Sequence, residues 1–103
     1  MIIGTTPTHF FKNRFKASEI KEVRILYAQN DTLLVKKTTV DCDIQDNLIT
    51  VTLTEDDTFK FDAKEPMEIQ LRVVTTTDKV LNTVPKRVGV TKCLDEEVII
   101  NVQ

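Results

Sequence analysis

Residues 67–74 read Met-Glu-Ile-Gln-Leu-Arg-Val-Val, the most regular alternation of apolar and polar residues in the chain. Successive side chains of a β-strand point to opposite faces, so this period of two gives one apolar and one polar face. The apolar face carries Met67, Ile69, Leu71 and Val73. The polar face carries Glu68, Gln70 and Arg72. The pattern predicts the central strand of a sheet, with the polar face as a candidate interaction surface.

Length and composition set the class of protein. A chain of 103 residues is close to the commonest domain size, so we expect a single domain over residues 1–103. Apolar residues make up 41% and charged residues 29%, as is typical of globular proteins. The net charge of -2 supplies no excess of positive charge for a phosphate backbone, so no nucleic-acid partner is expected.

The two cysteines, Cys42 and Cys93, lie far apart in the sequence. A disulfide framework in so short a chain normally uses more cysteines, which favours free thiols in a cytoplasmic protein. A single bridge between them stays open, because sequence does not test its geometry. The apolar start at residues 1–3 lacks the basic region of a signal peptide, and no apolar run approaches the ~18 residues of a membrane helix.

Strand-like runs separated by turn signals fill the chain. Asn30-Asp31 and Asp46-Asn47 each predict the turn of a β-hairpin. Pro85 interrupts the strand that returns after residues 77–79, which suits the edge of a sheet. The predicted strands are residues 5–11, 22–29, 33–39, 40–44, 48–54, 67–74, 80–84 with 86–92, and 98–102.

Two short helical turns are predicted between the strands. Thr54 is a good N-cap, and Asp57 three residues later completes a capping arrangement for one α-helical turn. Phe59 and Phe61 follow as candidates to plug the end of the core. A second turn, of 3₁₀ type, is expected near residues 17–22, with Ser18 as its cap.

These elements predict an all-β fold, an antiparallel two-sheet sandwich of about seven or eight short strands with one helical turn. One apolar face per strand and no long covering helix favour two packed sheets over the alternative, a small barrel. The strand pattern is immunoglobulin-like. The Cys…Trp…Cys hallmark of antibody domains is absent, because the sequence has no tryptophan.

No residues of the chain form a convincing catalytic or metal-binding set. His9, the only histidine, has no partner nearby in the sequence and is interpreted as a surface or edge-strand residue. The acidic run at residues 55–57 lacks the spacing and glycine of a calcium loop. Asp41, Asp43 and Asp46 are better explained as protection of an edge strand, with a loose divalent-cation site as the alternative. We therefore expect no enzyme, no cofactor and no metal.

A basic and aromatic stretch lies near the N-terminus. Lys12, Arg14 and Lys16 alternate with Phe11 and Phe15, a composition found in proteins that bind single-stranded nucleic acids. The structural explanation is stronger. It makes the two phenylalanines core anchors, with Phe10 as an alternative to Phe11, and the cations their neighbours in solvent.

Six short motifs follow one another along nearly the whole chain. They are residues 4–8 (GTTPT), 25–29 (ILYAQ), 53–61 (LTEDDTFKF), 68–73 (EIQLRV), 80–81 (VL) and 93–99 (CLDEEVI). In this order they resemble a group of small uncharacterised proteins that phages and prophages of Firmicutes encode among their virion structural genes. That group carries a glycine in the turn after the central strand, where this chain has Thr77, Asp78 and Lys79. The resemblance implies a structural or accessory protein that acts by protein–protein contact.

The expected function is therefore a non-enzymatic structural or interaction module, phage-derived, whose partners are other protein subunits or a second copy of the chain. It would be cytoplasmic or virion-associated. The alternative is a β-sandwich domain that binds a small ligand, carbohydrate or cation through loops at one end.

Overall fold

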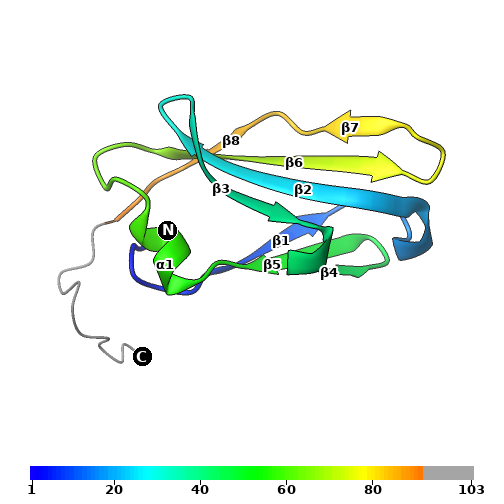
Figure 1. The fold of residues 1–103 in the computed structure, drawn as a ribbon, viewed down its shortest axis with the longest axis horizontal. Coiled ribbons are helices and arrows are strands. Elements are labelled where there is room, and N and C mark those ends of the chain that lie inside the picture. Colours follow the sequence, from blue (N-terminus) through cyan, green and yellow to red (C-terminus); the bar gives the residue numbers. More distant parts are fainter. Residues whose placement is uncertain (92–103) are drawn as a thin grey trace.

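A computed structural model of the chain describes residues 1–91 (Figure 1). Its strands are β1 (Thr8–Lys12), β2 (Ile20–Gln29), β3 (Thr32–Thr38), β4 (Cys42–Gln45), β5 (Leu48–Thr52), β6 (Met67–Thr75), β7 (Val80–Asn82) and β8 (Lys86–Val88). Its helical segments are the 3₁₀ turns η1 (Ala17–Glu19) and η2 (Thr39–Asp41) and the α-helix α1 (Glu55–Phe59). The predicted strand at residues 98–102 lies outside the described residues.

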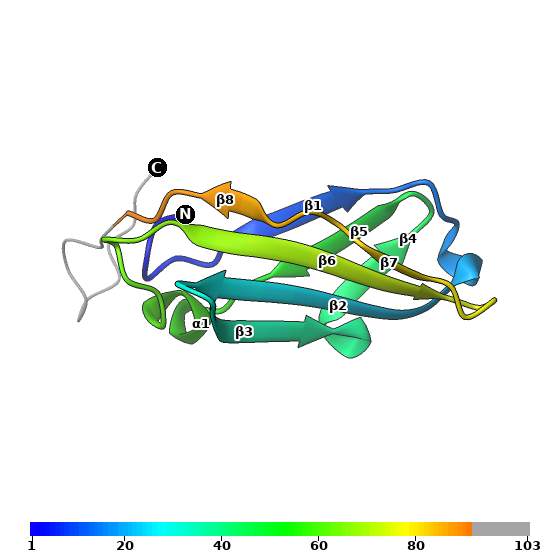
Figure 2. The same cartoon turned by 90° about the horizontal axis from the view of Figure 1, so that it is seen from above.

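The strands form two antiparallel sheets packed face to face, as Figures 1 and 2 show. The smaller sheet has the order β1-β5-β4. The larger has the order β3-β2-β6-β7, and β8 also pairs with β6 beyond the end of β7. The predicted all-β antiparallel sandwich is confirmed.

Strand β6 lies inside the larger sheet, between β2 on one side and β7 with β8 on the other. The predicted core face is buried along its whole length. Its exposed fractions are 0% for Met67, 8% for Ile69, 5% for Leu71 and 3% for Val73. Strand β2 matches β6 in this respect, with Val23, Ile25 and Tyr27 all at 0%. Two long neighbouring strands, rather than one, therefore carry the centre of the fold.

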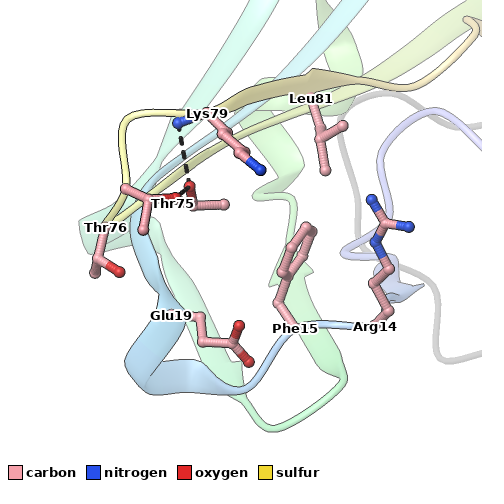
Figure 3. Close-up of a pocket in the computed structure, with 8 residues that line it drawn as sticks. Arg14, Phe15, Glu19, Thr75, Thr76, Lys79 and Leu81 are labelled. Atoms are coloured by element: carbon pink, nitrogen blue, oxygen red, sulfur yellow. Dashed lines mark hydrogen bonds between the residues drawn. The ribbon is translucent and has the colours of Figure 1, made fainter.

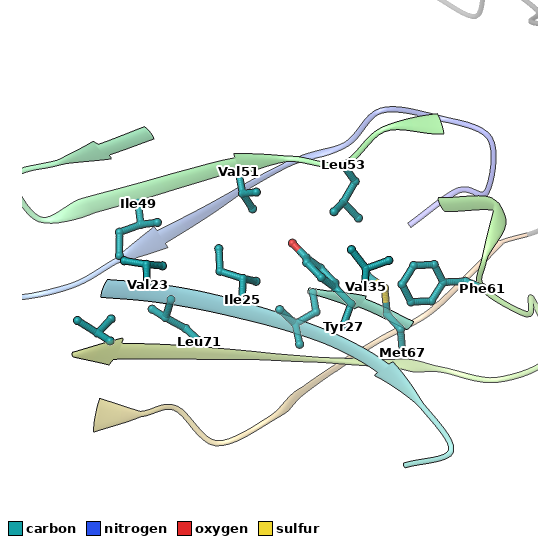
Figure 4. Close-up of a cluster of buried hydrophobic side chains, with 12 residues drawn as sticks. Val23, Ile25, Tyr27, Val35, Ile49, Val51, Leu53, Phe61, Met67 and Leu71 are labelled. Carbon is teal, nitrogen blue, oxygen red and sulfur yellow. The ribbon is translucent and has the colours of Figure 1, made fainter. Parts of the chain in front are cut away.

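The smaller sheet covers this face through the apolar side of β5. Ile49 and Val51 on β5, and Leu53 just after it, are buried at 0–1% exposure. Figure 4 shows these side chains pointing across the core toward Val23, Ile25 and Tyr27. Phe61 closes the same core at one end, as the sequence predicts, at 5% exposure. Phe59 is only half-buried and stands outside this cluster, so its predicted role as a plug is wrong.

The first hairpin turn explains an ambiguity of the sequence. Asn30 (φ 49°) and Asp31 (φ 61°) both adopt left-handed conformations, as a type I′ turn requires. A register shift follows between Tyr27 and Ala28, where β3 carries one extra residue. The bulge selects which face of β3 is buried: Val35 is 5% exposed, whereas Leu33 is 52% exposed.

Two local expectations need correction. The predicted strand 40–44 begins only at Cys42, because the Asp41 carboxylate accepts a hydrogen bond from the Thr38 N–H (2.9 Å) and closes η2. At η1, Ser18 lies inside the turn and is not its cap. There the Glu19 carboxylate accepts from the Lys16 N–H at 3.0 Å. In both turns an acidic residue three positions on reaches back to the first N–H.

The capping arrangement at α1 is the predicted one. The Asp57 N–H donates to Thr54 Oγ1 (3.0 Å), and the Thr54 N–H donates to Asp57 Oδ2 (2.9 Å). Asp57 Oδ2 also lies 2.7 Å from Lys37 Nζ, an ion pair whose two side chains are only 13% and 15% exposed. This pair joins the helix to β3.

The outer edge of β6 carries two short strands because Pro85 separates them. The bonds of Thr83 bridge the interruption: its N–H donates to the Leu71 carbonyl, and its Oγ1 accepts from the Leu71 N–H, both at 2.9 Å. The predicted second half of this strand ends at Val88, earlier than residue 92. In the preceding turn Asp78 adopts a φ of 63°, the conformation that a glycine favours at this place.

Candidate functional site: the open edge along β1

The sequence predicts the polar face of β6 as an interaction surface, and several of its side chains contact neighbouring strands. Gln70 Nε2 donates to the Thr83 carbonyl at 2.8 Å, which fixes the neighbouring edge. Arg72 stands opposite Arg24 on β2, and Arg24 forms an ion pair with Glu22 at 2.7 Å. Glu68 stands opposite Arg87 on β8. Glu68, Gln70 and Arg72 thus share a face, but none of them lines the concavities at β1 and at the β6–β7 turn.

The larger concavity is a groove lined by β1, β6, β8 and the segment between β7 and β8. Figure 2 shows where these elements lie in the sandwich. Its volume is about 510 Å³. Both of its sides carry apolar side chains, with lysines at the margins. The lining residues are Thr8, His9, Phe10, Phe11, Lys12, Ile69, Leu71, Thr83, Val84, Lys86 and Val88.

Backbone groups of β1 also face this side. Residues opposite one another in an antiparallel pair alternate between bonded and non-bonded pairs. The Leu53 N–H donates to the Pro7 carbonyl and the Asn13 N–H to the Asn47 carbonyl, both at 3.0 Å, so odd-numbered residues here bond to the β5 side. The even-numbered residues turn their N–H and C=O groups outward. They are Thr8, Phe10 and Lys12.

Two exposed apolar side chains mark the rim of the groove. Phe10 is 65% exposed and Val84 is 86% exposed. The sequence left Phe10 and Phe11 as alternative core residues, and the structure assigns the core contact to Phe11. Lys12 and Lys86 supply positive charge, and no carboxylate is among the lining residues. The groove thus suits an apolar segment with negative charge at its margins.

His9 lies on the edge strand β1, as expected, but its ring turns inward. His9 Nδ1 lies 2.7 Å from the Tyr27 hydroxyl, and Tyr27 is fully buried. Burial lowers the pKa of His9, and the charge of the N-terminal amine lowers it further. Burial, with nearby Cys42 and Asp57, raises the pKa of Tyr27 well above its usual range. Both groups are therefore neutral near pH 7 and form a structural hydrogen bond at the floor of the groove.

The aspartates that the sequence offered as a cation site have separate structural roles. Asp41 caps η2, Asp43 accepts from Gln45 Nε2 at 3.1 Å, and Asp46 accepts from the Ala17 N–H at 2.8 Å. Within residues 1–91 no group of three His, Cys, Asp or Glu side chains is arranged to hold a metal ion.

Cys42 begins β4 and carries a half-buried thiol. Burial raises the pKa of this thiol, and nearby Asp41 adds to the effect, which is opposed by Lys37. A raised pKa favours the protonated form of the thiol, which is the less nucleophilic one. Its alternative bridge partner, Cys93, lies outside the described residues.

The described part of the chain contains no helix long and apolar enough to cross a membrane. In comparisons with known proteins, the chain matches no family model, no curated protein and no solved structure. The candidate site therefore rests on the geometry of β1 and its groove.

Proposed function

We propose that this protein is a non-enzymatic interaction module that binds an extended segment of another protein along β1. The observation that carries the proposal is the groove of about 510 Å³ beside a strand whose alternate backbone groups face outward. An added strand would pair with those groups and place every second side chain in the groove. Main-chain hydrogen bonds then supply affinity, and the groove supplies selectivity.

The other edges of the two sheets are protected against such pairing. Strand β4 has four residues and carries Asp43. Strand β3 carries the exposed Lys36 and is bent by the bulge opposite Tyr27 and Ala28. The remaining edge is broken at Pro85. Charges, bulges and prolines are the usual means of blocking sheet edges, and β1 has none of them between Thr8 and Phe11.

The partner has a definite chemistry in this proposal. It is an extended segment with apolar residues at alternate positions and carboxylates toward its ends, which meet Lys12 and Lys86. The sequence resemblance supports a partner that is another subunit of a phage-like particle. In that case the protein would be cytoplasmic before assembly and virion-associated afterwards.

The test uses a seven-residue peptide of alternating valine and threonine with glutamate at both ends. Amide hydrogen exchange of the protein is measured with and without this peptide. We expect the amides of Thr8, Phe10 and Lys12 to become protected, because they pair with the peptide. The amides of His9 and Phe11 already pair with β5 and should change little. Protection of both sets alike, or of neither, would contradict strand addition at β1.

A proline variant separates backbone pairing from side-chain contact. Phe10→Pro removes one outward N–H and should lower peptide affinity more than Phe10→Ala by about fivefold, since one net hydrogen bond is worth roughly 1 kcal/mol. Phe10→Pro should still fold, because its N–H does not bond to β5. If both variants bind equally, the backbone does not take part. Light scattering of the free protein shows separately whether a second copy occupies the edge.

A further inference from the structure

A second concavity lies at the end of the sandwich that carries the β6–β7 turn (Figure 3). Its volume is about 230 Å³. Its walls come from the segment before β2 and from the turn between β6 and β7. The lining residues are Arg14, Phe15, Glu19, Thr75, Thr76, Thr77, Lys79 and Leu81.

The two walls are held together by the sheet itself. Ile20 at the start of β2 stands opposite Thr75 at the end of β6. One residue further, the Thr76 N–H donates to the Glu19 carbonyl at 2.9 Å. Residues about 60 positions apart in the sequence thereby face one another at a fixed separation.

The turn that forms the second wall is ordered by its own hydrogen bonds. The Thr75 N–H donates to the Lys79 carbonyl at 2.9 Å, and the Lys79 N–H donates to Thr75 Oγ1 at 3.2 Å. Thr75 Oγ1 also lies 3.0 Å from Thr77 Oγ1. Thr75 is 6% exposed, so these bonds are shielded from water. A ligand therefore meets a preformed surface and loses little free energy in ordering it.

Charge around this cavity is unbalanced. Among the described residues neither Arg14 nor Lys79 forms an ion pair, whereas nearby Lys21 and Asp78 pair with each other at 3.1 Å. The Arg14 guanidinium lies 5.5 Å from the centre of the Phe15 ring, which holds it at the cavity wall. With the Glu19 carboxylate counted, the lining keeps one net positive charge for an anion, and an arginine with a lysine is a common carboxylate-binding combination.

The other lining groups further restrict the chemical class of the ligand. Figure 3 shows Lys79 and Leu81 on one side of the cavity, with the Phe15 ring between Arg14 and Glu19 on the other. Phe15 and Leu81 offer an apolar surface to the flat side of a ring. The hydroxyl of Thr76 and the second oxygen of Glu19 offer polar partners for hydroxyl groups, since the first already accepts from Lys16. The volume lies below the ~300–1,000 Å³ of pockets for drug-sized ligands, so one ring-sized group fits.

From these observations we propose that this cavity binds a hydroxylated organic carboxylate of the size of a single sugar acid. The carboxylate lies between Arg14 and Lys79, and its ring lies against Phe15. The two concavities share no lining residue, and this proposal is tested with a different ligand from the strand addition proposed at β1. Either proposal can therefore fail while the other stands.

The test is a titration of ¹⁵N-labelled protein with D-glucuronate in buffer with physiological salt, with D-glucose and inorganic phosphate as comparison ligands. We expect glucuronate to shift the amide signals of residues 14–19 and 75–79 in a saturable way. Glucose and phosphate should shift them at much higher concentration, if at all. The absence of saturable shifts with glucuronate overturns the proposal. Equal binding of glucose or of phosphate overturns the assignment of a hydroxylated carboxylate.

Variants then test the two cations. Arg14→Gln and Lys79→Gln should each weaken glucuronate binding by about tenfold, as expected for a charge-assisted hydrogen bond at a partly exposed site. Lys21→Gln is the matched control, because it removes the same charge from the same end but outside the cavity. It should leave affinity within about twofold. Equal weakening by all three variants would show a general charge effect and overturn the site.

Discussion

The two ends of the sandwich, one with α1 and the other with the β6–β7 turn (Figure 1), differ in their polar side chains. At the α1 end they are buried and bonded to loops, whereas at the β6–β7 end the charged side chains stand exposed around a cavity. At the α1 end, Gln29 and Thr58 are 6% and 0% exposed, and each forms three hydrogen bonds. At the other end, Arg14 and Lys79 are exposed and form no ion pair within residues 1–91. The buried hydrogen bonds at the first end hold the loops against the sheets, and the second end carries the cavity proposed to bind a ligand.

This difference suggests that the α1 end contributes to stability and the β6–β7 end to ligand binding. If it is correct, substitutions at the α1 end should lower the free energy of unfolding strongly. Substitutions at the β6–β7 end should change ligand binding with little effect on stability.

The largest effect is expected at Gln29. Its Nε2 donates to the carbonyls of Asp62 (2.7 Å) and Glu65 (2.8 Å), and its Oε1 accepts from the Asp62 N–H (2.7 Å). Gln29→Met keeps the volume but removes all three bonds, and should cost about 2–3 kcal/mol of unfolding free energy. Urea denaturation measures this loss. A loss below about 0.5 kcal/mol would show that water replaces the side chain and that this end is not closed by it.

Thr58 should follow with a smaller loss. Its Oγ1 accepts from the Gly4 N–H (2.9 Å), and its one hydroxyl proton is shared between the carbonyls of Glu55 (2.9 Å) and Thr5 (3.1 Å). Thr58→Val has the same shape without the hydroxyl and leaves the Gly4 N–H without its partner. We expect a loss of about 1–2 kcal/mol in thermal or urea denaturation. Thr58→Ser retains the hydroxyl and serves as the control, with a smaller loss than valine if the hydrogen bonds matter.

The ion pair between Lys37 and Asp57 should make this end sensitive to acid. Burial alone would raise the pKa of Asp57, but hydrogen bonds from Lys37 and Thr54 outweigh it and hold the pKa below the ordinary 3.8. The stabilisation is thus complete above about pH 3.8 and is lost as the pH falls through the lower folded-state value. Asp57→Asn should lower stability at pH 6, and its difference from wild type should shrink toward pH 2. A difference that does not change with pH would refute the assigned role of the charge.

The smallest effect is expected at the β6–β7 end. Thr76→Ala and Lys79→Gln alter exposed side chains, and Lys79 uses its backbone, not its ammonium, to order the turn. Each substitution should change the unfolding free energy by no more than about 0.5 kcal/mol. Circular dichroism melts check this. A loss comparable to that of Gln29→Met would remove the contrast between the two ends.

The sequence predicts the elements of this fold better than their arrangement. The period of two in residues 67–74, the turn residues Asn30-Asp31 and the box of Thr54 with Asp57 all act over a few positions, so local chemistry fixes them. Gln29 also leaves a signal that was missed. It follows Val23, Ile25 and Tyr27 at every second position of β2 and so lies on the same buried face. A polar residue at such a position indicates a side chain that is hydrogen-bonded inside the core.

The candidate sites depend on pairings between distant segments, which the sequence does not reveal. The groove exists because β1 joins β5, which leaves Phe10 on an outer edge. The cavity exists because Ile20 meets Thr75. The sequence indicates the face of β6 that bears Gln70, but it does not indicate where the concavities lie, and this face lines neither of them.

The interruption at Pro85 has a consequence for the valency of the protein. A molecule with usable edges on both sheets could add partners without limit and grow into a fibre. Here Thr83 bonds both backbone groups of Leu71, and Pro85 interrupts the strand pairing along β6. The edge formed by β7 and β8 therefore does not offer a continuous row of backbone groups to a further strand. Among residues 1–91, β1 is then the one edge without such a block, so strand addition as proposed would let each molecule accept one strand. A protein of that kind would be monovalent: it would finish a larger assembly without extending it.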